Sequence, residues 1–391
     1  MEKSKDLGVY DVAIIGLGVA GSNLAANLKP HLKVIAIDKK DKEGDCFDDN
    51  FHKPCGGLLS EGGQKALAKQ GLNLPNEVLV NPQIFAINTI DFGFKYASYI
   101  QKGYVNMERH KFDLWLKGLI PSHIHSFHRA YFKSIQKEGA FYQVHFKQEQ
   151  DSLESSTQSY TCKVRIVVGA DGAKSHIRRF LYPHLKTQSL VCIQQWYKEH
   201  NKPMLSCIFD KTLTPSYSWS MSKDGYFIFG GAYPHAHCKA AFNTQKVRLE
   251  GLGFIFTEVL KQEACLVLQP QRWRDFVRGR NGVFLIGEAA GFINASTLEG
   301  ISGALHSSRI LSEVLNSIVS YNQGESGVKL DSKTLENLHS VYTKRTRLLV
   351  LKTLFRHYVR YPFMFITILR RIILFCGILR VRSGMIRNKI I

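Results

Sequence analysis

The order of apolar and polar positions predicts a strand, a helix and a second strand at the start of the chain. Residues 10–15 (YDVAII) form a short apolar run that ends at a glycine-rich turn, which is typical of a buried strand. A helical stretch, SNLAANLKP, follows the turn, and the apolar run 33–37 predicts the next strand. This alternation is characteristic of an α/β fold built on a parallel sheet.

The turn between these elements contains three glycines with the spacing GxGxxG. Gly16 permits a tight turn, Gly18 lets the backbone approach a pyrophosphate, and Gly21 lets the helix pack closely on the strand. The N-terminus of the helix offers N–H groups and a partial positive charge to phosphates. Asp38 ends the second strand, where a carboxylate accepts hydrogen bonds from a ribose hydroxyl. We therefore predict a dinucleotide site, which the motif alone does not assign to NAD or FAD.

Two later segments also run from a strand through a glycine turn into a helix. The first carries the turn Asp171-Gly172, and the second carries the turn Gly287-Glu288. The three units, each more than a hundred residues from the next, resemble the flavoprotein monooxygenases and reductases with the hydroxylase-type FAD fold. The resemblance implies FAD as the cofactor, with the first of these two turns near the pyrophosphate and the second near the ribityl chain.

A further segment, YVNMERHKFDLWL from residue 104, resembles the motif V-x-R-x-x-F-D-x-x-L of the same group. The resemblance implies that Arg109 contacts the cofactor. Phe112, Trp115 and Leu116 recur at helical spacing in this segment, which indicates core packing rather than a role in binding.

Two other runs resemble geranylgeranyl reductases, which saturate isoprenoid double bonds. The run K-P-C-G-G contains Cys55, Gly56 and Gly57 and resembles the flavin-side loop of that family, which implies that these residues lie against the cofactor. The run YSWSMSKDG contains Tyr217 and Trp219 and resembles the family's strand Y-x-W-x-F-P-K-x-D/G, with Met-Ser in place of Phe-Pro.

The run GEAAGFINASTLEGI ends at Gly300 and Ile301 and resembles the family's G-D/E-A-A-G-F-x-x-P-x-x-x-E-G-I, which places both residues in the cofactor site. Ala295 stands where the family has Pro. Four segments together resemble the CbrA family, a bacterial branch of the geranylgeranyl-reductase-like flavoproteins: NPQIF (81–85), IQQWY (193–197), YSWSMSKDGYFIFGGAYP (217–234) and GEAAGFINASTLEGIS (287–302). The resemblance implies FAD binding and oxidoreductase activity, and it supplies no established substrate.

The resemblance also implies a discontinuous Rossmann-type FAD-binding domain. We place this domain at residues 1–80, 101–180 and 270–325. Segments 81–100 and 181–269 are expected to form an inserted, mostly antiparallel substrate sheet over the flavin. β-Branched and aromatic residues between turn signals support this expectation over four stretches: 186–196, 204–210, 216–221 and 226–233.

Composition excludes a disordered chain, because 45% of the 391 residues are apolar. Eight cysteines lack CxxC spacing, and no histidine pair has the spacing of zinc ligands, so we expect reduced thiols in a cytosolic protein and no metal site. The chain has 52 Lys and Arg against 32 Asp and Glu, a net charge of +20 that favours an acidic partner.

The excess charge is concentrated near the C-terminus. Residues 344–389 contain twelve Lys and Arg and no Asp or Glu, which leaves +8 for the rest of the chain. The basic residues are interspersed with apolar ones, and the uncharged runs are too short to span a bilayer. We predict that 334–391 is a basic amphipathic helical tail on an anionic membrane surface, at the inner face of the cytoplasmic membrane. The alternative is a helix that packs on the core, and a nucleic acid partner is not expected.

These features predict an enzyme that reduces carbon–carbon double bonds of an apolar, polyprenyl-like substrate. Tyr217 and Trp219 point to one face of a strand, where they line either a pocket or the core. Cys55 is a candidate proton donor or pocket residue, or simply a small residue beside glycines. Oxygen-dependent hydroxylation through a flavin hydroperoxide and non-catalytic binding of flavin or lipid stay open, whereas the halogenase motif W-x-W-x-I-P is missing. No second dinucleotide motif identifies the electron donor, so NAD(P)H and a ferredoxin-like protein both remain candidates.

Overall fold

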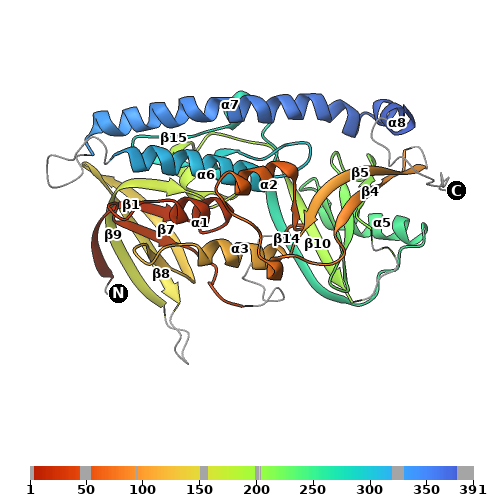
Figure 1. The fold of residues 1–391 in the computed structure, drawn as a ribbon, viewed down its shortest axis with the longest axis horizontal. Coiled ribbons are helices and arrows are strands. Elements are labelled where there is room, and N and C mark those ends of the chain that lie inside the picture. Colours follow the sequence, from red (N-terminus) through yellow and green to blue (C-terminus); the bar gives the residue numbers. More distant parts are fainter. Residues whose placement is uncertain are drawn as a thin grey trace.

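The protein has two β-sheets that lie along its longest axis, with one long helix crossing both (Figure 1). The computed structural model describes seven stretches of the chain: 4–44, 54–93, 96–149, 157–198, 202, 204–318 and 330–376. The first sheet is formed mainly by the glycine-turn segments, and the second by the inserted segments.

The first sheet follows the order β15-β16-β9-β1-β2-β6, in which β16-β9-β1-β2-β6 are parallel and β15 pairs with β16 in the antiparallel direction. An antiparallel pair, β7 and β8, extends it beside β9. The strands are β1 (Lys5–Ile15), β2 (Val34–Ile37), β6 (His125–Phe127), β7 (Ala130–Glu138), β8 (Phe141–Glu149), β9 (Thr157–Gly169), β15 (Gly279–Arg280) and β16 (Val283–Leu285). All four residues of β2 are buried, which is typical of a strand covered on both faces.

The strands of this sheet are apolar on both faces, so both faces are covered by other elements. Helices cover one of them. Val12 and Ile14 point toward a core shared with three helices: α1 (Val19–Ala26), α3 (Arg109–Gly118) and α6 (Ile301–Asn316). Ala13 and Ile15 point to the other side, toward β7, β8 and the short helix α4 (His176–Leu181). Helix α2 (Glu61–Ala68) packs beside α6.

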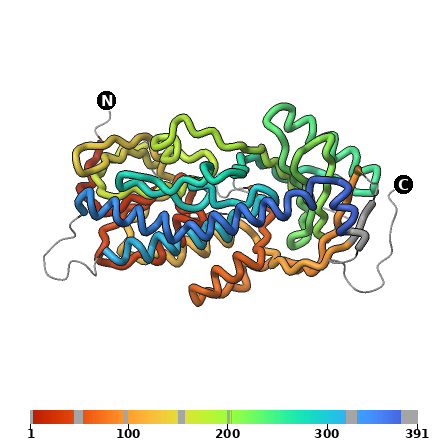
Figure 2. The backbone as a smooth tube through the Cα atoms, turned by 90° about the horizontal axis from the view of Figure 1, so that it is seen from above, coloured from red at the N-terminus to blue at the C-terminus, as the bar shows by residue number. Residues whose placement is uncertain are grey.

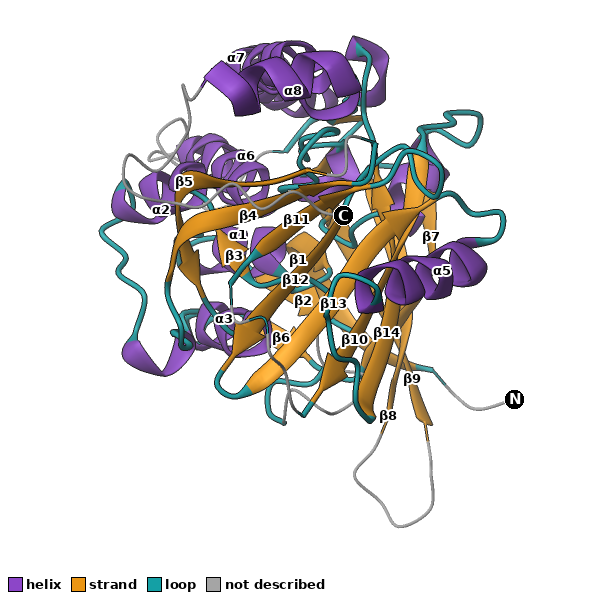
Figure 3. Cartoon of the chain, turned by 90° about the vertical axis from the view of Figure 1, so that its right-hand side faces the viewer, coloured by secondary structure: helices purple, strands orange, loops and turns teal. Residues whose placement is uncertain are grey.

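The second sheet follows the order β14-β10-β13-β12-β11-β4-β5-β3, and among its pairs only β4 and β11 are parallel. Its strands are β3 (Leu58–Leu59), β4 (Ile84–Asp91), β5 (Tyr96–Asn106), β10 (Ser189–Tyr197), β11 (Ser206–Phe209), β12 (Ser218–Lys223), β13 (Tyr226–Tyr233) and β14 (Val259–Leu268). Strand β5 continues to Asn106, past the domain boundary expected at residue 100. Figure 3 shows helix α5 (Cys238–Glu250) on the outer face of this sheet, where Ile193 and Tyr197 pack against it.

The C-terminal part of the described chain forms two helices, α7 (Ser332–Phe365) and α8 (Thr367–Cys376). Figure 2 shows α7 running along the length of the molecule. Tyr342 Oη donates to the carbonyl of Leu285 at 2.9 Å, and Arg370 of α8 pairs with Asp91 of β4 at 2.6 Å. In the described part of the chain, no helix is both long and apolar enough to cross a bilayer. The predicted α/β fold with an inserted, mostly antiparallel sheet and a helical C-terminal region is confirmed.

Candidate functional site

The first glycine turn forms a cradle whose glycines have different neighbours. Gly16 has a φ of +97°, and a Cβ there would lie 2.8 Å from the carbonyl oxygen of Ala170. A Cβ on Gly21 would lie 1.8 Å from the carbonyl oxygen of Gly16, so helix α1 packs directly on the turn. Among the described residues, no atom lies within 4 Å of the position of a Cβ on Gly18, and no side chain caps α1. The backbone is therefore exposed at the point where a pyrophosphate would approach.

Asp38 follows β2 beside this cradle, but its carboxylate already has a partner. Lys117, in the last turn of α3, lies 2.8 Å from Asp38 Oδ2 and also donates to the carbonyl of Asp41 at 2.6 Å. Both side chains are nearly inaccessible to solvent. The sequence offered no sign of Lys117, because only the packing of α3 brings it to Asp38.

Arg109 begins α3 and forms a buried ion pair within the helix. Its Nε lies 2.9 Å from Asp113 Oδ1, and the guanidinium also hydrogen-bonds Cys55. Burial disfavours both charges, but their mutual attraction outweighs it, so the pKa of Arg109 lies above its usual value and that of Asp113 below. Cys55 Sγ also accepts from the N–H of Gly57 at 3.4 Å. The sulfur thus acts as an acceptor that holds its loop beside Arg109.

The loop at Gly56 and Gly57 is enclosed by residues of the second sheet. A Cβ on Gly56 would lie 2.8 Å from Cε of Met221 and 3.5 Å from Nε1 of Trp219. Gly57 has a φ of +64°, and a Cβ there would lie 2.3 Å from the carbonyl oxygen of Met107. These contacts leave no room for a side chain, so the loop brings bare backbone against the sheet.

Lys223, at the end of β12, hydrogen-bonds the loop that contains Gly57. It was not among the site residues predicted from the sequence. Its Nζ donates to Asn106 Oδ1 at 2.6 Å, to the carbonyl of Met107 at 2.6 Å and to the carbonyl of Gly57 at 3.2 Å. The three acceptors match the three protons of an ammonium group. Burial lowers the pKa of Lys223 to about 8, although the nearby carboxylate of Glu108 opposes this shift.

The turn at Asp171 and Gly172 is stabilised by its own side chain. Asp171 accepts from Ser175 Oγ at 2.5 Å and from the N–H of His176 at 2.6 Å, so it caps α4. Burial raises the pKa of Asp171, and these hydrogen bonds counteract part of the shift. Gly172 has a φ of +73°, and no atom of the residues that the structure describes lies within 4 Å of where its Cβ would be. The backbone of Gly172, rather than the carboxylate, is therefore the part of the turn that is open to a cofactor.

The turn at Gly287 and Glu288 joins the two halves of the protein. Gly287 has a φ of +56°, and its N–H donates to Ser307 Oγ of α6 at 2.9 Å. Glu288 Oε1 accepts from the N–H of Leu268, the last residue of β14, at 3.0 Å. This carboxylate oxygen therefore links the first sheet to the second, a contact that the sequence did not indicate.

Two tyrosines of the second sheet bind the segment that leads into α6. Tyr217 Oη donates to the carbonyl of Thr297 at 2.6 Å, and Tyr104 Oη donates to Glu299 Oε1 at 2.7 Å. Gly300 and Ile301 follow directly, and no side chain caps the N-terminus of α6. Burial raises the pKa of Tyr217 well above its usual value, so this phenol stays protonated and bound to the backbone. Its contacts are those of a positioning residue for the start of α6.

Trp219 lies on the same face of the sheet as Tyr217, as predicted, with ring centroids 5.9 Å apart. Both side chains are half-buried. Trp219 Nε1 is buried and has no hydrogen-bond partner in the part of the chain that the structure describes. An indole N–H without an acceptor beside a glycine loop is consistent with a ligand at this position.

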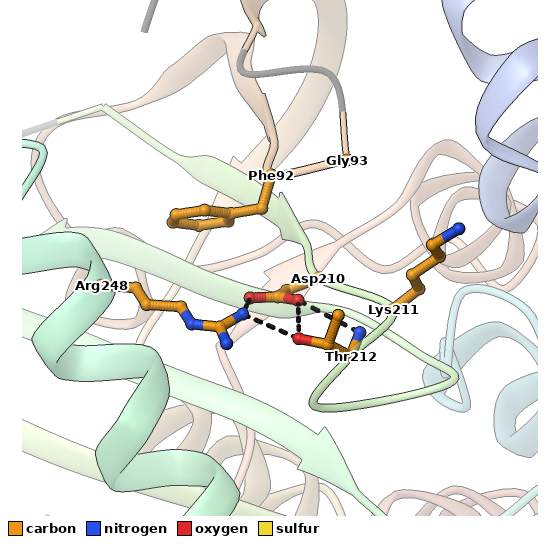
Figure 4. A pocket seen from close by; sticks show the side chains of 6 residues that line it. All are labelled: Phe92, Gly93, Asp210, Lys211, Thr212 and Arg248. Atoms are coloured by element: carbon orange, nitrogen blue, oxygen red, sulfur yellow. Dashed lines mark hydrogen bonds and ion pairs between the residues drawn. The ribbon is translucent and has the colours of Figure 1, made fainter. Parts of the chain in front are cut away.

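A separate hollow of about 330 Å³ lies beyond the C-terminal ends of β4 and β11, next to α5 (Figure 4). Its charged groups largely satisfy one another, because Asp210 accepts from Thr212 and forms an ion pair with Arg248. Phe92 covers one side, and Lys211 points away from the pair. The hollow shares no lining residue with the glycine turns.

Solved structures that share this fold include FAD-dependent enzymes. One is a geranylgeranyl bacteriochlorophyll reductase-like protein from Thermoplasma acidophilum, 17% identical, with a TM-score of 0.69 over 93% of this chain and 90% of that one. Another is PqsL of Pseudomonas aeruginosa, described as a probable FAD-dependent monooxygenase, 14% identical, with a TM-score of 0.64 over 94% and 100% of the two chains. A third is the myxobacterial chondrochloren halogenase, 12% identical, with a TM-score of 0.57 over 88% and 82%. The fold is that of the FAD-dependent oxidoreductases, which supports FAD as the cofactor.

Within this class, sequence comparison assigns the chain to the CbrA family. It is 45% identical over 344 residues to Protein CbrA of Escherichia coli strain K12, which covers 88% of this chain and 90% of that protein. It is 48% identical over 307 residues to Protein CbrA of E. coli O157:H7, covering 78% and 84% of the two chains. No protein-family model matches the chain. The chain belongs to the CbrA family, and the predicted resemblance is confirmed.

Proposed function

We propose that the protein is an FAD-dependent reductase that saturates carbon–carbon double bonds of an apolar, polyprenyl-like lipid. The single observation that carries the substrate class is the apolar face that the second sheet turns toward the glycine loop. Trp219 and the buried Met221 pack directly against Gly56, and the half-buried side chains of Trp219, Leu58 and Ile87 are accessible members of this apolar cluster. An alkene chain is bound by such a surface without any need for charged groups.

The described residues suit each part of FAD: its phosphates, its ribose and its flavin ring. The open backbone at Gly18 and Gly172 suits the phosphates, and Asp38 suits the ribose. The uncapped N-terminus of α6 at Gly300 and Ile301 suits the flavin ring, whose negative charge on reduction a helix N-terminus stabilises. When bound and reduced, FAD supplies the hydride.

The chain's own contribution is to orient the alkene and to exclude water from it. Tyr104 and Tyr217 hold the start of α6, while Lys223 holds the glycine loop. One alkene carbon takes the hydride, and the other takes a proton from water or from the Cys55 thiol. Each saturated bond therefore gains one hydrogen pair and oxidises one reduced cofactor, which an external donor must reduce again.

The structural neighbours support both reductase and monooxygenase chemistry on this fold. The likeness to the Thermoplasma acidophilum protein and the apolar face near Gly56 favour reduction. Lipid that co-purifies with the protein is therefore the material with which to separate the two reactions.

The test is mass spectrometry of that lipid before and after anaerobic reduction of the holoenzyme with dithionite. We expect a gain of one hydrogen pair per double bond, and none with the Gly18→Ala variant, in which a methyl group occupies the cofactor approach. A mass gain of one oxygen atom that requires air would replace the proposal with hydroxylation. Lipid that is unchanged in both conditions, with FAD bound and reduced, would contradict any catalytic role toward it.

A further inference from the structure

We infer that the outer face of α7 and α8 binds the surface of an anionic lipid bilayer. This inference concerns a different part of the molecule from the cofactor site and does not depend on the proposed reaction. The two helices form one long surface, which lies along the top of the molecule in the view of Figure 1.

The inner face of α7 is occupied by the protein core. Tyr342, Thr346, Val350 and His357 are buried, and their spacing places them along one side of the helix. His357 Nδ1 lies 2.7 Å from Ser296 Oγ, so the helix is attached to the segment that leads into the start of α6. The alternative considered for the tail, a helix that packs on the core, therefore describes this side of α7.

The opposite face of α7 carries large apolar side chains that no described residue covers. Leu348, Leu351, Phe355 and Val359 are all exposed, and they recur every three or four residues. Phe355 has 69% of its surface exposed, which is unusual for a phenylalanine in a well-packed helix. Ile368 and other apolar residues of α8 continue the row. A contiguous apolar row of this length marks a binding surface.

Exposed basic residues line both sides of this apolar row. Arg347 lies on one side of the row, and Lys352 and Arg356 lie on the other, while Lys344 stands on the row itself one turn before Leu348. The described part of the chain from residue 344 onward contains no acidic residue. A central apolar row with basic flanks matches the acyl chains and the headgroups of an anionic membrane surface.

The charge pattern distinguishes this partner from others. A symmetric contact between two copies would bring the same basic rows face to face, which is unfavourable. A nucleic acid could pair its phosphates with the basic residues, but it would place phosphates and water against the apolar row, which is unfavourable. A bilayer satisfies both parts of the surface at once, because the apolar side chains enter the acyl region while the basic heads remain at the headgroups.

Arg370 fixes the angle between this surface and the second sheet. It pairs with Asp91 of β4, both side chains are buried, and its guanidinium stacks 4.3 Å from the ring centroid of Phe209. Helix α8 is thereby held against the sheet, and the two helices present their apolar residues as parts of one rigid surface.

The experiment is co-sedimentation of the FAD-bound full chain with vesicles of phosphatidylcholine alone or with roughly one-third phosphatidylglycerol. We expect binding to the anionic vesicles that weakens as salt is added. Each basic residue near such a surface contributes about a fivefold factor, so Lys352→Glu with Arg356→Glu is expected to weaken binding at least about 30-fold. Leu351→Ser with Phe355→Ser is expected to weaken binding to the same or a greater extent.

Matched controls come from α5, which also has exposed residues of both kinds. Val247 is 66% exposed, so Val247→Ser tests the loss of an exposed apolar side chain elsewhere, and Lys239→Glu tests the loss of a charge. FAD content and the unfolding temperature show that each variant is folded. Wild-type protein that stays in the supernatant, or α7 variants that bind as the α5 controls do, would overturn the inference. A dimer that is lost on Phe355→Ser, without vesicle binding, would assign the face to a second copy instead.

Discussion

Gly16–Gly21 and Gly56-Gly57 both bring bare backbone to the site, but different parts of the protein require their glycines. In the first turn, the atoms that a Cβ would meet belong to the turn itself and to Ala170, which follows the neighbouring strand β9. In the second, they belong to Met107, Met221 and Lys223, which lie in or beside the second sheet. The first turn is therefore complete within one sheet, whereas the second exists only when the sheets have come together.

This difference separates two kinds of motif. A turn whose neighbours are its own strand and helix keeps its geometry wherever the β–α–β unit folds, so its spacing alone is informative. A loop whose contacts come from residues far along the chain has a geometry that those residues determine. Its own sequence indicates only that glycine is needed. Substitutions in the two segments should consequently differ in what they damage.

The largest loss of stability is expected for Gly21→Ala. The new Cβ would lie 1.8 Å from the carbonyl oxygen of Gly16, so backbone must move and α1 must separate from β1. We expect the free energy of unfolding to fall by about 3 kcal/mol or more, together with the loss of bound FAD. Chemical denaturation of the purified variant measures the first effect, and flavin absorbance measures the second. A Gly21→Ala variant with wild-type stability would mean that the turn tolerates a side chain, and the contacts of the turn would then not require glycine there.

A smaller loss is expected for Lys223→Met, which removes the support of the second segment only. Three buried acceptors, including the carbonyl of Gly57, lose their donor, so we expect a cost of about 2 kcal/mol at neutral pH. The Gly16–Gly21 turn should be unaffected.

The effect of Lys223 should also depend on pH, in a direction that follows from its burial. Its pKa is about 8 in the folded protein, against 10.5 for the ordinary side chain. Between these values the unfolded chain binds more protons, so the contribution of Lys223 to stability increases as the pH rises from about 8. The stability difference between wild type and Lys223→Met should therefore grow over this range, as denaturation at several pH values will show. The exposed Lys239, changed to Met, serves as the control and should show no such trend.

The smallest effect on stability is expected for Gly18→Ala. No atom in the described part of the chain lies within 4 Å of the new Cβ, so the free energy of unfolding of the FAD-free protein should change by less than about 1 kcal/mol, the cost of a poorer helix cap. FAD affinity should nevertheless fall at least about tenfold, because the methyl group occupies the approach of the pyrophosphate. Fluorescence titration with FAD measures this change. An equal loss of stability and of affinity would show that Gly18 has the same structural role as Gly21.

In the first sheet, the strands next to the glycine turns (β1, β2, β9 and β16) were predictable because each is encoded by a local apolar run and its flanking glycines, whereas β6, β7, β8 and β15 were not predicted. In the second sheet, β10, β11, β12 and β13 were visible as β-branched and aromatic runs, to within a few residues at their ends, but β14 was not. The extension of β5 to Asn106 was not visible, because it depends on pairing with β3 at Leu58 and Leu59. Pairing partners far apart in sequence leave no local signal.

The polar contacts of the site were the least predictable part. Lys117 beside Asp38 and Lys223 beneath Gly57 are lysines on amphipathic elements, where a solvent-exposed side chain is the usual expectation. Tyr217 was expected in a pocket or the core, but its hydroxyl binds the carbonyl of Thr297. Each contact joins residues from different elements, so it depends on how those elements pack.

The C-terminal helices α7 and α8 show the same difference between what local sequence determines and what packing determines. The amino-acid order alone makes both helices strongly basic and gives α8 one apolar side, whereas α7 has apolar residues on two opposite sides. It does not say which of two apolar rows is buried, since both satisfy the same periodicity. Packing settles the matter: Tyr342, Val350 and His357 find partners in the core, while Leu351 and Phe355 are left on the outside with the charge. The amino-acid order thus determines where side chains lie around a helix. The shape of the rest of the protein determines which side of the helix packs against the core.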